Sequence, residues 1–296
     1  MTKTAFIAIV GRPNVGKSTL LNAILGEKVA IVSKKPQTTR NRITGIHTAN
    51  DNQFVFLDTP GLHKPRTKLG DFMVKATNET LGGVDAAILV VEAREEVGDI
   101  ESALINRFKS DGLPAILVIN KVDAVSPVNI AKTIAAYAAA YDFDAVVPLS
   151  AKNGKGIDIL ISECEKYLYE GDWLFSEDMV TDQPERLVAA EIIREKLLRT
   201  LDEEIPHGTA VSIEEWREKR GTVSIRAEIY CEKATHKGII IGKSGATIKK
   251  IGTYAREDIE KMLDAKVFLD LYVRVKENWR DSDFNITNLG YNKEEF

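Results

Sequence analysis

Short apolar runs alternate with longer stretches of helical character over the first 170 residues. The apolar runs predict five β-strands, over Ala5–Val10, Gln53–Leu57, Ala86–Val91, Ala115–Ile119 and Ala145–Leu149. The stretches between them predict helices, including Ile130–Ala140 and Ile157–Tyr169. Strands and helices that alternate at this spacing indicate an α/β fold, a mostly parallel sheet with helices on both faces. In such sheets, ligands bind at the carboxyl ends of the strands.

The pattern changes after an acidic stretch. Acidic residues crowd positions 170–185, which predicts an exposed linker over 171–185. We therefore expect a first domain over 1–170 and a second over 186–296 that ends in a C-terminal tail. The second domain is expected to contain a helix over Leu187–Leu201, strands over Thr209–Trp216 and Val223–Glu232, a further helix, and a strand over Val267–Val275. This order predicts a smaller α+β domain.

Composition supports a soluble protein of two domains. The chain has 296 residues, of which 44% are hydrophobic and 28% are charged, which argues against disordered and collagen-like classes. Its two cysteines, Cys164 and Cys231, are too few for a disulfide framework and favour a reducing compartment. No apolar run approaches the roughly 18 residues of a membrane helix, and the first residues do not form a signal peptide. We therefore expect a cytoplasmic location.

Charge is spread unevenly along the chain. The 40 basic and 44 acidic residues give a net charge of −4, which by itself predicts no attraction to nucleic acid. Residues 233–256, however, carry six basic side chains and no acidic one. A local basic face of this kind can attract phosphates while the rest of the surface keeps the protein soluble.

Residues 11–18 have the sequence GRPNVGKS and match the phosphate-binding pattern G-x-x-x-x-G-K-S, between a predicted strand and a predicted helix. The glycines allow backbone N–H groups to surround phosphate oxygens, and the start of the helix adds partial positive charge. Lys17 is expected to reach the β- and γ-phosphates, and Ser18 to bind Mg²⁺. The candidate nucleotide-binding residues here are Gly11, Arg12, Pro13, Asn14, Val15, Gly16, Lys17, Ser18 and Thr19.

A second motif, Asp58-Thr59-Pro60-Gly61, follows the strand over Gln53–Leu57. The Asp58 carboxylate can hold the hydration shell of Mg²⁺, and the Gly61 N–H can detect a γ-phosphate. Alone, this sequence is an ordinary turn, but its position after a phosphate loop favours the functional interpretation. The candidate nucleotide-binding residues of this motif are Asp58, Thr59, Pro60, Gly61 and Leu62.

Two further motifs are suited to reading a base. Asp123, in the sequence NKVD, can accept hydrogen bonds from N1–H and the exocyclic amine of guanine, whereas adenine would leave the carboxylate unpaired. Asn120 is expected to brace the loops and the Lys121 stem to cover the base. A backbone N–H of the SAK sequence can contact guanine O6. The candidate residues are Asn120, Lys121, Val122 and Asp123, together with Ser150, Ala151 and Lys152.

Four motifs in this order make residues 5–169 resemble the translation-factor-related GTPases. The resemblance implies a threonine that completes the Mg²⁺ shell when GTP is bound, for which Thr39 is favoured over Thr38. The metal ligands would then be Ser18, Thr39 and Asp58, and the catalytic residues Lys17, Thr39, Asp58 and Gly61. Residues 28–50 around this threonine carry five basic side chains and no acid, which is typical of a solvated loop or of a loop that contacts RNA or accelerates hydrolysis.

One departure from that family bears on the mechanism. Many of its members orient the attacking water with a glutamine at the position of Leu62, which cannot form this hydrogen bond. We therefore expect slow hydrolysis of GTP to GDP without a partner. Asn14 occupies the position at which potassium-stimulated relatives hold a monovalent cation, so the resemblance also implies K⁺ as a cofactor beside Mg²⁺.

Residues 239–251 resemble the core of a KH domain, with a Gly-x-x-Gly turn before an amphipathic helix. Two glycines allow the backbone to approach a sugar–phosphate chain, and the neighbouring lysines predict salt-dependent affinity for single-stranded RNA. The candidate RNA-binding residues are Lys237, Ile241, Gly242, Lys243, Ser244, Gly245, Lys249 and Lys250. The element order is similar to the prokaryotic KH variant. The aromatic residues Tyr254, Tyr272 and Trp279 are expected in the core.

The combination of GRPNVGKS, QTTR, DTPGLHKP, AAEIIREK and a KH module is similar to the bacterial Era family, over nearly the whole chain. The resemblance implies an assembly GTPase of the small (30S) ribosomal subunit that binds near the 3′ end of 16S rRNA, with loose association at the inner face of the membrane. We expect a monomer. Two alternatives stay open: an RNA-binding scaffold in which the guanine nucleotide is structural, and an ATPase.

Overall fold

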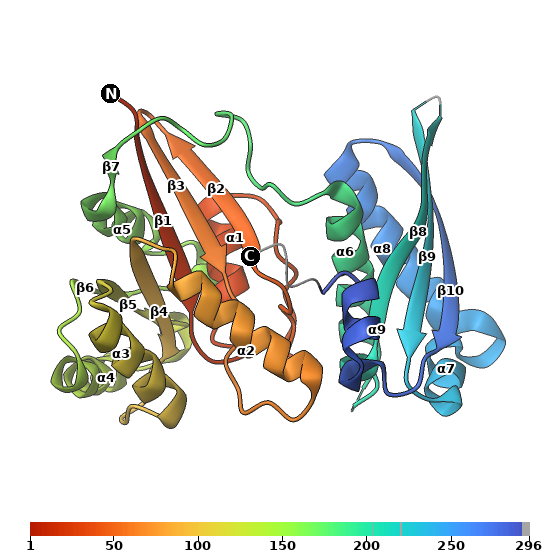
Figure 1. The fold of residues 1–296 in the computed structure, drawn as a ribbon, viewed down its shortest axis with the longest axis horizontal. Coiled ribbons are helices and arrows are strands. Elements are labelled where there is room, and N and C mark those ends of the chain that lie inside the picture. The colour runs from red at the N-terminus through yellow and green to blue at the C-terminus, as the bar shows by residue number, and fades with distance from the viewer. Residues whose placement is uncertain (203, 220, 292–296) are drawn as a thin grey trace. The chain divides into compact units, whose positions relative to one another are not determined.

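The computed structural model describes residues 1–202, 204–219 and 221–291. The end of the predicted C-terminal tail, residues 292–296, lies outside this part of the chain. The main division into two compact units falls between Asp182 and Gln183 (Figure 1). None of the described helices has the length and apolar character needed to cross a bilayer.

The first unit is built on one sheet with the strand order β2-β3-β1-β4-β5-β6. Its strands are β1 (Lys3–Val10), β2 (Ile43–Ala49), β3 (Asn52–Asp58), β4 (Ala86–Glu92), β5 (Ala115–Asn120), β6 (Ala145–Pro148) and the short β7 (Tyr169–Glu170). All neighbours pair in parallel except β2 with β3 and β7 with β1. The predicted mostly parallel sheet is therefore confirmed.

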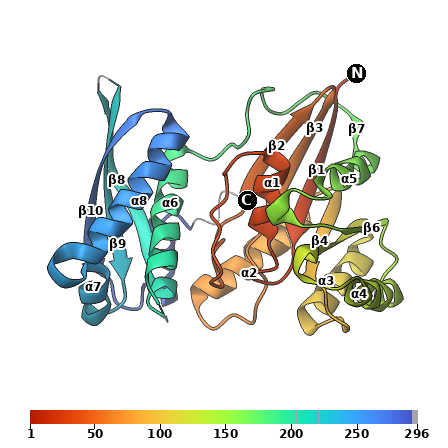
Figure 2. The ribbon, with the colours of Figure 1, turned by 180° about the vertical axis from the view of Figure 1, so that it is seen from behind.

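Helices cover both faces of this sheet (Figures 1 and 2). They are α1 (Lys17–Leu25), α2 (Lys68–Leu81), α3 (Asp99–Asp111), α4 (Pro127–Ala140) and α5 (Ile157–Cys164). Apolar side chains of α1 and α5 pack on one face, and those of α2, α3 and α4 on the other. Every residue of β5 is buried, which explains why its first five residues, Ala115–Ile119, form a continuous apolar run rather than an alternating one.

One local expectation for this unit was wrong, and one strand was not predicted. The predicted helix over Ile157–Tyr169 ends at Cys164, a 3-10 turn follows, and Tyr169 belongs to β7. The edge strand β2 was not predicted, because its threonines, glycine and histidine give no clear apolar pattern. Its pairing with the buried β3, rather than its own composition, makes it a strand.

Residues 171–182 run along the β2–β3 edge of the first unit. Backbone N–H groups of Leu174 and Phe175 donate to Gln53 Oε1 at 2.9 and 3.1 Å. Further along, Ile46 N–H donates to the Val180 carbonyl at 2.9 Å. The division between the units thus lies near the C-terminal end of the stretch for which the acidic composition predicts a linker.

The second unit is an α+β domain. It contains α6 (Glu185–Thr200), β8 (Ala210–Lys219), β9 (Thr222–Cys231), α7 (Ala234–Ile241), α8 (Ala246–Leu263), β10 (Lys266–Val275) and α9 (Asp283–Asn288). The sheet order is β10-β9-β8, with β8 antiparallel and β10 parallel to β9. Alternate residues of β9 are buried, and apolar side chains of α6 and α8 cover that face.

The second unit also differs from expectation in detail. The apolar residues before the Gly-x-x-Gly turn form the last turn of α7, so two helices flank the turn rather than one. Trp279 is fully buried, as expected, and its indole N–H donates to the Gly208 carbonyl at 2.9 Å. Tyr254 and Tyr272 were wrongly expected in the core, because they are 47% and 42% exposed. Tyr254 lies on the outer side of α8, and Tyr272 on the uncovered face of the sheet.

Candidate functional site

The four nucleotide motifs lie at the same edge of the first sheet. The phosphate loop connects β1 to α1, and the other three motifs follow β3, β5 and β6. Because these strands are mutually parallel, their carboxyl ends meet at one edge (Figure 2). Segments that are distant in the sequence are therefore brought together by the direction of the strands.

The side chain of Asn120 connects three of these loops. Its amide nitrogen donates to the Val15 carbonyl of the phosphate loop at 2.8 Å. Its oxygen accepts hydrogen bonds from the backbone N–H groups of Lys121, at 2.7 Å, and Ala151, at 3.0 Å. Only 2% of Asn120 is exposed. A short amide with both donor and acceptor atoms is therefore required at this position.

Gly16 is required where the phosphate loop meets Asn120. Its φ of 103° is rarely adopted by other residues, and a Cβ atom here would lie 2.3 Å from Asn120 Nδ2. The next residue, Lys17, starts α1 and is 6% exposed. Its ammonium group donates to the carbonyls of Gly11 and Arg12 at 3.1 and 2.9 Å. Burial lowers the pKa of Lys17 to about 8, although the nearby Asp58 opposes this shift.

Three side-chain oxygens converge beside Lys17. Ser18 Oγ donates to Asp58 Oδ2 at 2.6 Å and lies 2.8 Å from Thr39 Oγ1. Thr38 points elsewhere, because its hydroxyl donates to the Lys35 carbonyl at 2.7 Å. The structure thus brings Thr39, rather than Thr38, to Ser18 and Asp58.

This group of oxygens is suited to a hard divalent cation. Asp58 is fully buried, and its second oxygen, Oδ1, has no hydrogen-bond partner among the residues that the structure describes. Burial raises the pKa of Asp58 to about 6, against the opposing effects of Lys17 and of hydrogen bonds from Ser18 and Thr39. A carboxylate and two hydroxyls are ligands that Mg²⁺ accepts, with water and phosphate oxygens in its remaining positions. The donor set therefore fits Mg²⁺.

The base-reading motifs also lie close together. Ser150 Oγ donates to Asp123 Oδ1 at 2.6 Å, and this hydrogen bond lowers the pKa of Asp123. The carboxylate is exposed, and it is ionised at neutral pH, so it is available to two guanine N–H groups. Lys121 extends from this loop toward the phosphate loop, where its ammonium group binds the Asn14 carbonyl at 2.6 Å and pairs with Glu92. Lys152 is exposed nearby and lowers the pKa of Asp123 further.

The remaining predicted nucleotide residues have mainly backbone or packing roles in this structure. Leu62 N–H donates to the Gly11 carbonyl at 3.3 Å, and Thr59 N–H to the Ile9 carbonyl at 3.2 Å. A Cβ atom on Gly61 would lie 2.7 Å from Pro13, so the second motif contacts the phosphate loop directly. Val15, Thr59, Pro60 and Ala151 are buried, whereas Pro13, Thr19, Leu62 and Val122 are half-buried. Asn14 donates from its side chain to the Lys34 carbonyl at 2.9 Å.

Sequence reasoning missed His63, which joins the two loops around the metal ligands. His63 Nδ1 lies 3.1 Å from the Gly61 carbonyl, and Nε2 lies 3.0 Å from the Gln37 side-chain nitrogen. Because a carbonyl only accepts, Nδ1 carries the proton and Nε2 accepts from Gln37. The only signal in the sequence was the closeness of His63 to the second motif.

The Gly-x-x-Gly turn of the second unit lies between the end of α7 and the start of α8. A Cβ atom on Gly242 would lie 2.2 Å from Thr247 Oγ1, and its φ and ψ of 73° and 174° favour glycine. Of the predicted RNA-binding residues, Lys243, Ser244, Lys249 and Lys250 are exposed, and Lys237, Ile241, Gly242 and Gly245 are half-buried. The turn therefore presents lysines next to the positive end of an 18-residue helix.

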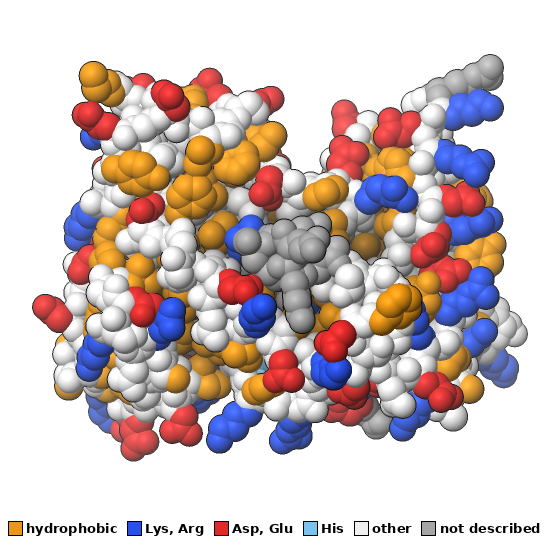
Figure 3. All heavy atoms as spheres, in the orientation of Figure 1, with side chains coloured by type: hydrophobic (Ala, Val, Ile, Leu, Met, Phe, Trp, Pro, Cys, Tyr) orange, Lys and Arg blue, Asp and Glu red, His pale blue; other side chains and the backbone are white. Residues whose placement is uncertain are grey.

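The uncovered face of the second sheet has a different character. Arg226 pairs with Glu215 and Arg274 with Glu228, both at 3.0 Å. Figure 3 shows basic and acidic side chains mixed in this part of the second unit. Since these charges compensate one another, the sheet face is less suited to a phosphate chain than the lysine-rich turn.

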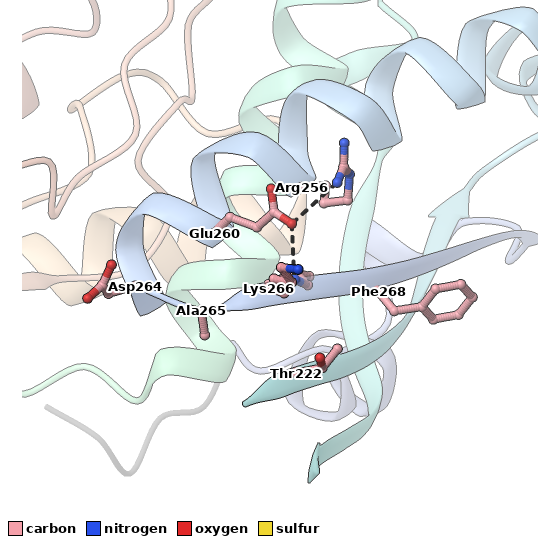
Figure 4. A pocket seen from close by; sticks show the side chains of 8 residues that line it. Thr222, Arg256, Glu260, Asp264, Ala265, Lys266 and Phe268 are labelled. Carbon is pink, nitrogen blue, oxygen red and sulfur yellow. Dashed lines mark hydrogen bonds and ion pairs between the residues drawn. The ribbon is translucent and has the colours of Figure 1, made fainter. Parts of the chain in front are cut away.

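A shallow hollow of about 670 Å³ lies between α8 and the start of β10 (Figure 4). Glu260 accepts there from Arg256 Nη1 at 3.3 Å and from the backbone N–H of Val267 at 3.1 Å. The exposed ring of Phe268 is at its side. The hollow is lined by none of the predicted nucleotide- or RNA-binding residues.

Comparisons with known proteins find a family match in each of the two units. Residues 6–121 match the family model described as 50S ribosome-binding GTPase, and residues 204–280 match that of the KH domain. GTPase Era of Clostridium novyi is 51% identical over 292 residues, which cover 98% of this chain and 99% of that protein. GTPase Era of Ruminiclostridium cellulolyticum is 49% identical over 290 residues, covering 98% and 97%. The chain belongs to the GTPase Era family.

Solved structures of Era have the same fold. Era in complex with MgGDPNP and nucleotides 1506–1542 of 16S ribosomal RNA superposes with a TM-score of 0.94, at 39% identity, over 98% of this chain and 99% of that one. A variant of Aquifex aeolicus Era bound to GDP and AlF4− gives the same TM-score, identity and coverage. Since these matches span both units, Era-family membership applies to the GTPase and KH domains together.

The buried Asp58 carboxylate leads to a pH-dependent prediction for the metal-free protein. Its pKa is raised from 3.8 to about 6 in the folded chain, so its ionisation destabilises the fold above about pH 6 and this cost is absent below about pH 4. We expect Asp58→Asn, in EDTA near pH 7.5, to increase the free energy of unfolding by roughly 1 kcal/mol, because the cost of ionising the buried carboxylate is removed and the loss of the charge opposite Lys17 offsets part of this gain. Denaturant unfolding at several pH values measures this gain, which should vanish in acid.

Asp123→Asn is a matched control, because the pKa of Asp123 is shifted in the opposite direction from that of Asp58. The pKa of Asp123 is lowered by the Ser150 hydrogen bond, so its ionised form stabilises the fold, and the variant should not stabilise the protein at neutral pH. A stability gain for both variants, or for neither, would contradict the assignment of the buried carboxylate.

Proposed function

We propose that this Era-family GTPase is a GTP-driven switch that binds 16S rRNA near its 3′ end and assists processing and assembly of the 30S ribosomal subunit. The observation that carries the proposal is the match, over nearly the whole chain, to Era with MgGDPNP and a 16S rRNA fragment. That relative holds nucleotide and RNA in one complex, and this chain has both a convergent set of nucleotide motifs and a lysine-rich Gly-x-x-Gly turn.

In the proposed mechanism, the phosphate loop amides and Lys17 bind the phosphates of GTP. Ser18, Thr39 and Asp58 would hold Mg²⁺, which supplies positive charge to the β- and γ-phosphate oxygens. Lys17 exchanges its two backbone carbonyl partners for phosphate oxygens, and it has to be charged to do so. The Gly61 N–H lies on the loop that can respond to loss of the γ-phosphate.

Base selection is assigned to the other end of the site. Asp123 accepts from guanine, Lys121 covers the base, and the Ala151 segment meets O6. Adenine lacks the two donors that Asp123 needs, so binding of ATP would leave this carboxylate without its partners. The proposal therefore predicts a GTPase rather than an ATPase.

Hydrolysis is expected to be slow until a partner binds. Leu62, at the position of the usual water-orienting glutamine, supplies no hydrogen bond to water, and positioning groups of this type are worth orders of magnitude in rate. The K⁺ site that the resemblance implies at Asn14 stays a prediction. The proposal further includes a monomeric, cytoplasmic protein with peripheral association at the inner face of the membrane.

Nucleotide-dependent RNA affinity distinguishes a switch from a scaffold with a structural nucleotide. We expect the affinity for a 16S rRNA 3′-terminal fragment to differ by about fivefold or more between GDPNP and GDP, because a ligand shifts an equilibrium only through differential binding. Filter binding with GDPNP, with GDP and without nucleotide measures the difference. Lys17→Ala is the control. This variant should keep the fold but lose nucleotide binding, and its RNA affinity should therefore be the same in all three nucleotide states. Equal RNA affinity in all three states would favour the scaffold.

A charge reversal at the Gly-x-x-Gly turn tests the RNA surface. Lys243→Glu should weaken binding of the same fragment about tenfold and reduce its salt dependence, since one phosphate contact is replaced by repulsion. GTP hydrolysis without RNA should not change. Gly242 is unsuitable for this test because any side chain there collides with Thr247.

Lys219→Glu is the control for the charge change itself. Lys219 is exposed and is the last residue of β8, where it pairs with Thr222 of β9, which in turn pairs with Lys266 at the start of β10. Since β10 begins just after the C-terminal end of α8, Lys219 lies at the opposite end of α8 from the Gly-x-x-Gly turn. An equal loss of RNA affinity in both variants would show a general electrostatic effect and would move the RNA site away from the turn.

A further inference from the structure

Arg12, in the phosphate loop, is held by a carboxylate from another element. Its guanidinium Nε and Nη2 both donate to Glu101 Oε2, at 2.7 and 2.5 Å. Glu101 lies in the first turn of α3 and is only 3% exposed. The Arg12 side chain is therefore bound to α3, although the motif alone assigns the residue to the nucleotide.

The backbone of α3 makes room for this pair. Gly98 is the N-cap residue of α3, a position where glycine is common beside serine, threonine, asparagine and aspartate. Its φ of −81° and ψ of 171° are accessible to any residue, so glycine is not needed for its conformation. A Cβ atom at Gly98 would, however, lie 1.5 Å from Arg12 Nη2. Any other residue at this position would therefore have to displace the guanidinium from its place beside Glu101.

The Arg12–Glu101 pair acts on the part of the loop that receives the phosphates. The Arg12 carbonyl is one of the two oxygens that bind the Lys17 ammonium group. On the other side, the loop is held by Asn120 through the Val15 carbonyl. Between these two anchors, the Asn14 carbonyl accepts from the Lys121 ammonium group and the Asn14 side chain donates to the Lys34 carbonyl.

We propose that Glu101 is a positioning residue that holds the first half of the phosphate loop, residues 11–14, in the conformation that accepts nucleotide. The inference rests on the nucleotide site proposed above. Without this anchor, binding has to order the loop, and the cost is the same for any nucleotide with a β-phosphate. The affinities for GTP and GDP should therefore fall together, whereas the bound state, once formed, reacts at an unchanged rate.

Two variants test the anchor by different routes. Glu101→Leu removes both hydrogen bonds, and Gly98→Ala keeps every charge but displaces the guanidinium. For each, we expect the Kd of labelled GDP and of a non-hydrolysable GTP analogue to rise about tenfold, with kcat within about twofold of the parent chain. Glu101→Gln, which retains an acceptor for Arg12, should recover part of the affinity. Gly83→Ala is the control, because that glycine has nothing within 4 Å of its Cβ position.

A double variant shows whether Gly98 acts through Arg12. In an Arg12→Ala background, Gly98→Ala should have no further effect on nucleotide affinity, since the collision no longer exists. A full additional loss would overturn the proposal. So would unchanged Kd values in Glu101→Leu and Gly98→Ala at a temperature where both are folded, even if their melting temperatures fall, because the pair would then be only structural.

The proposed site itself is tested separately in the same assay. If Lys17→Ala loses GDP binding while the Glu101 and Gly98 variants bind normally, the inference about Glu101 fails and the nucleotide site stands. If Lys17→Ala binds GDP normally, the site is misassigned, and the inference fails with it.

Discussion

The hydrogen bonds of the Asn120 side chain are the contacts on which the nucleotide site depends. One amide group connects the phosphate loop, the loop after β5 and the loop after β6, which come from three distant parts of the chain. Parallel strands place these loops at one edge, and a buried side chain with both a donor and an acceptor contributes to fixing their relative positions, beside the Lys121–Asn14 and Ser150–Asp123 contacts. The close approach at Gly16 is a consequence of the same contact. In the proposed mechanism, Asn120 would therefore couple phosphate binding to base recognition.

The charges inside the site indicate what it is built to receive. Lys17 and Asp58 are both buried, and burial lowers the pKa of Lys17 and raises that of Asp58, so that it favours the neutral form of each side chain. Such groups are unfavourable in isolation, and anionic phosphates and a divalent cation would compensate both at once. Without these ligands, the charged forms of both side chains are therefore energetically unfavourable in the site. In the proposed mechanism, nucleotide and metal contacts on the loops of Thr39 and Gly61 would favour one arrangement of those loops, to the extent that the ligands bind that arrangement better.

Motifs that depend on local backbone chemistry could be predicted from the sequence, whereas contacts between distant segments could not. The glycines, Lys17 and Asp58 follow from the turns that phosphate binding requires. Glu101 gave no signal, because its role depends on where α3 starts relative to the phosphate loop. The strand β2 and the packing of residues 171–182 depend in the same way on pairing with β3. Tyr254 and Tyr272 show that aromatic content alone does not distinguish a core position from an exposed one.

A crystal structure of this chain with MgGDPNP would show where the triphosphate, the metal and the guanine bind. We expect the triphosphate to be surrounded by the backbone N–H groups between Gly11 and Ser18, with the metal at Ser18, Thr39 and Asp58 and the guanine at Asp123. A triphosphate bound at any other place on the chain, or a metal bound away from the Ser18, Thr39 and Asp58 oxygens, would contradict this expectation.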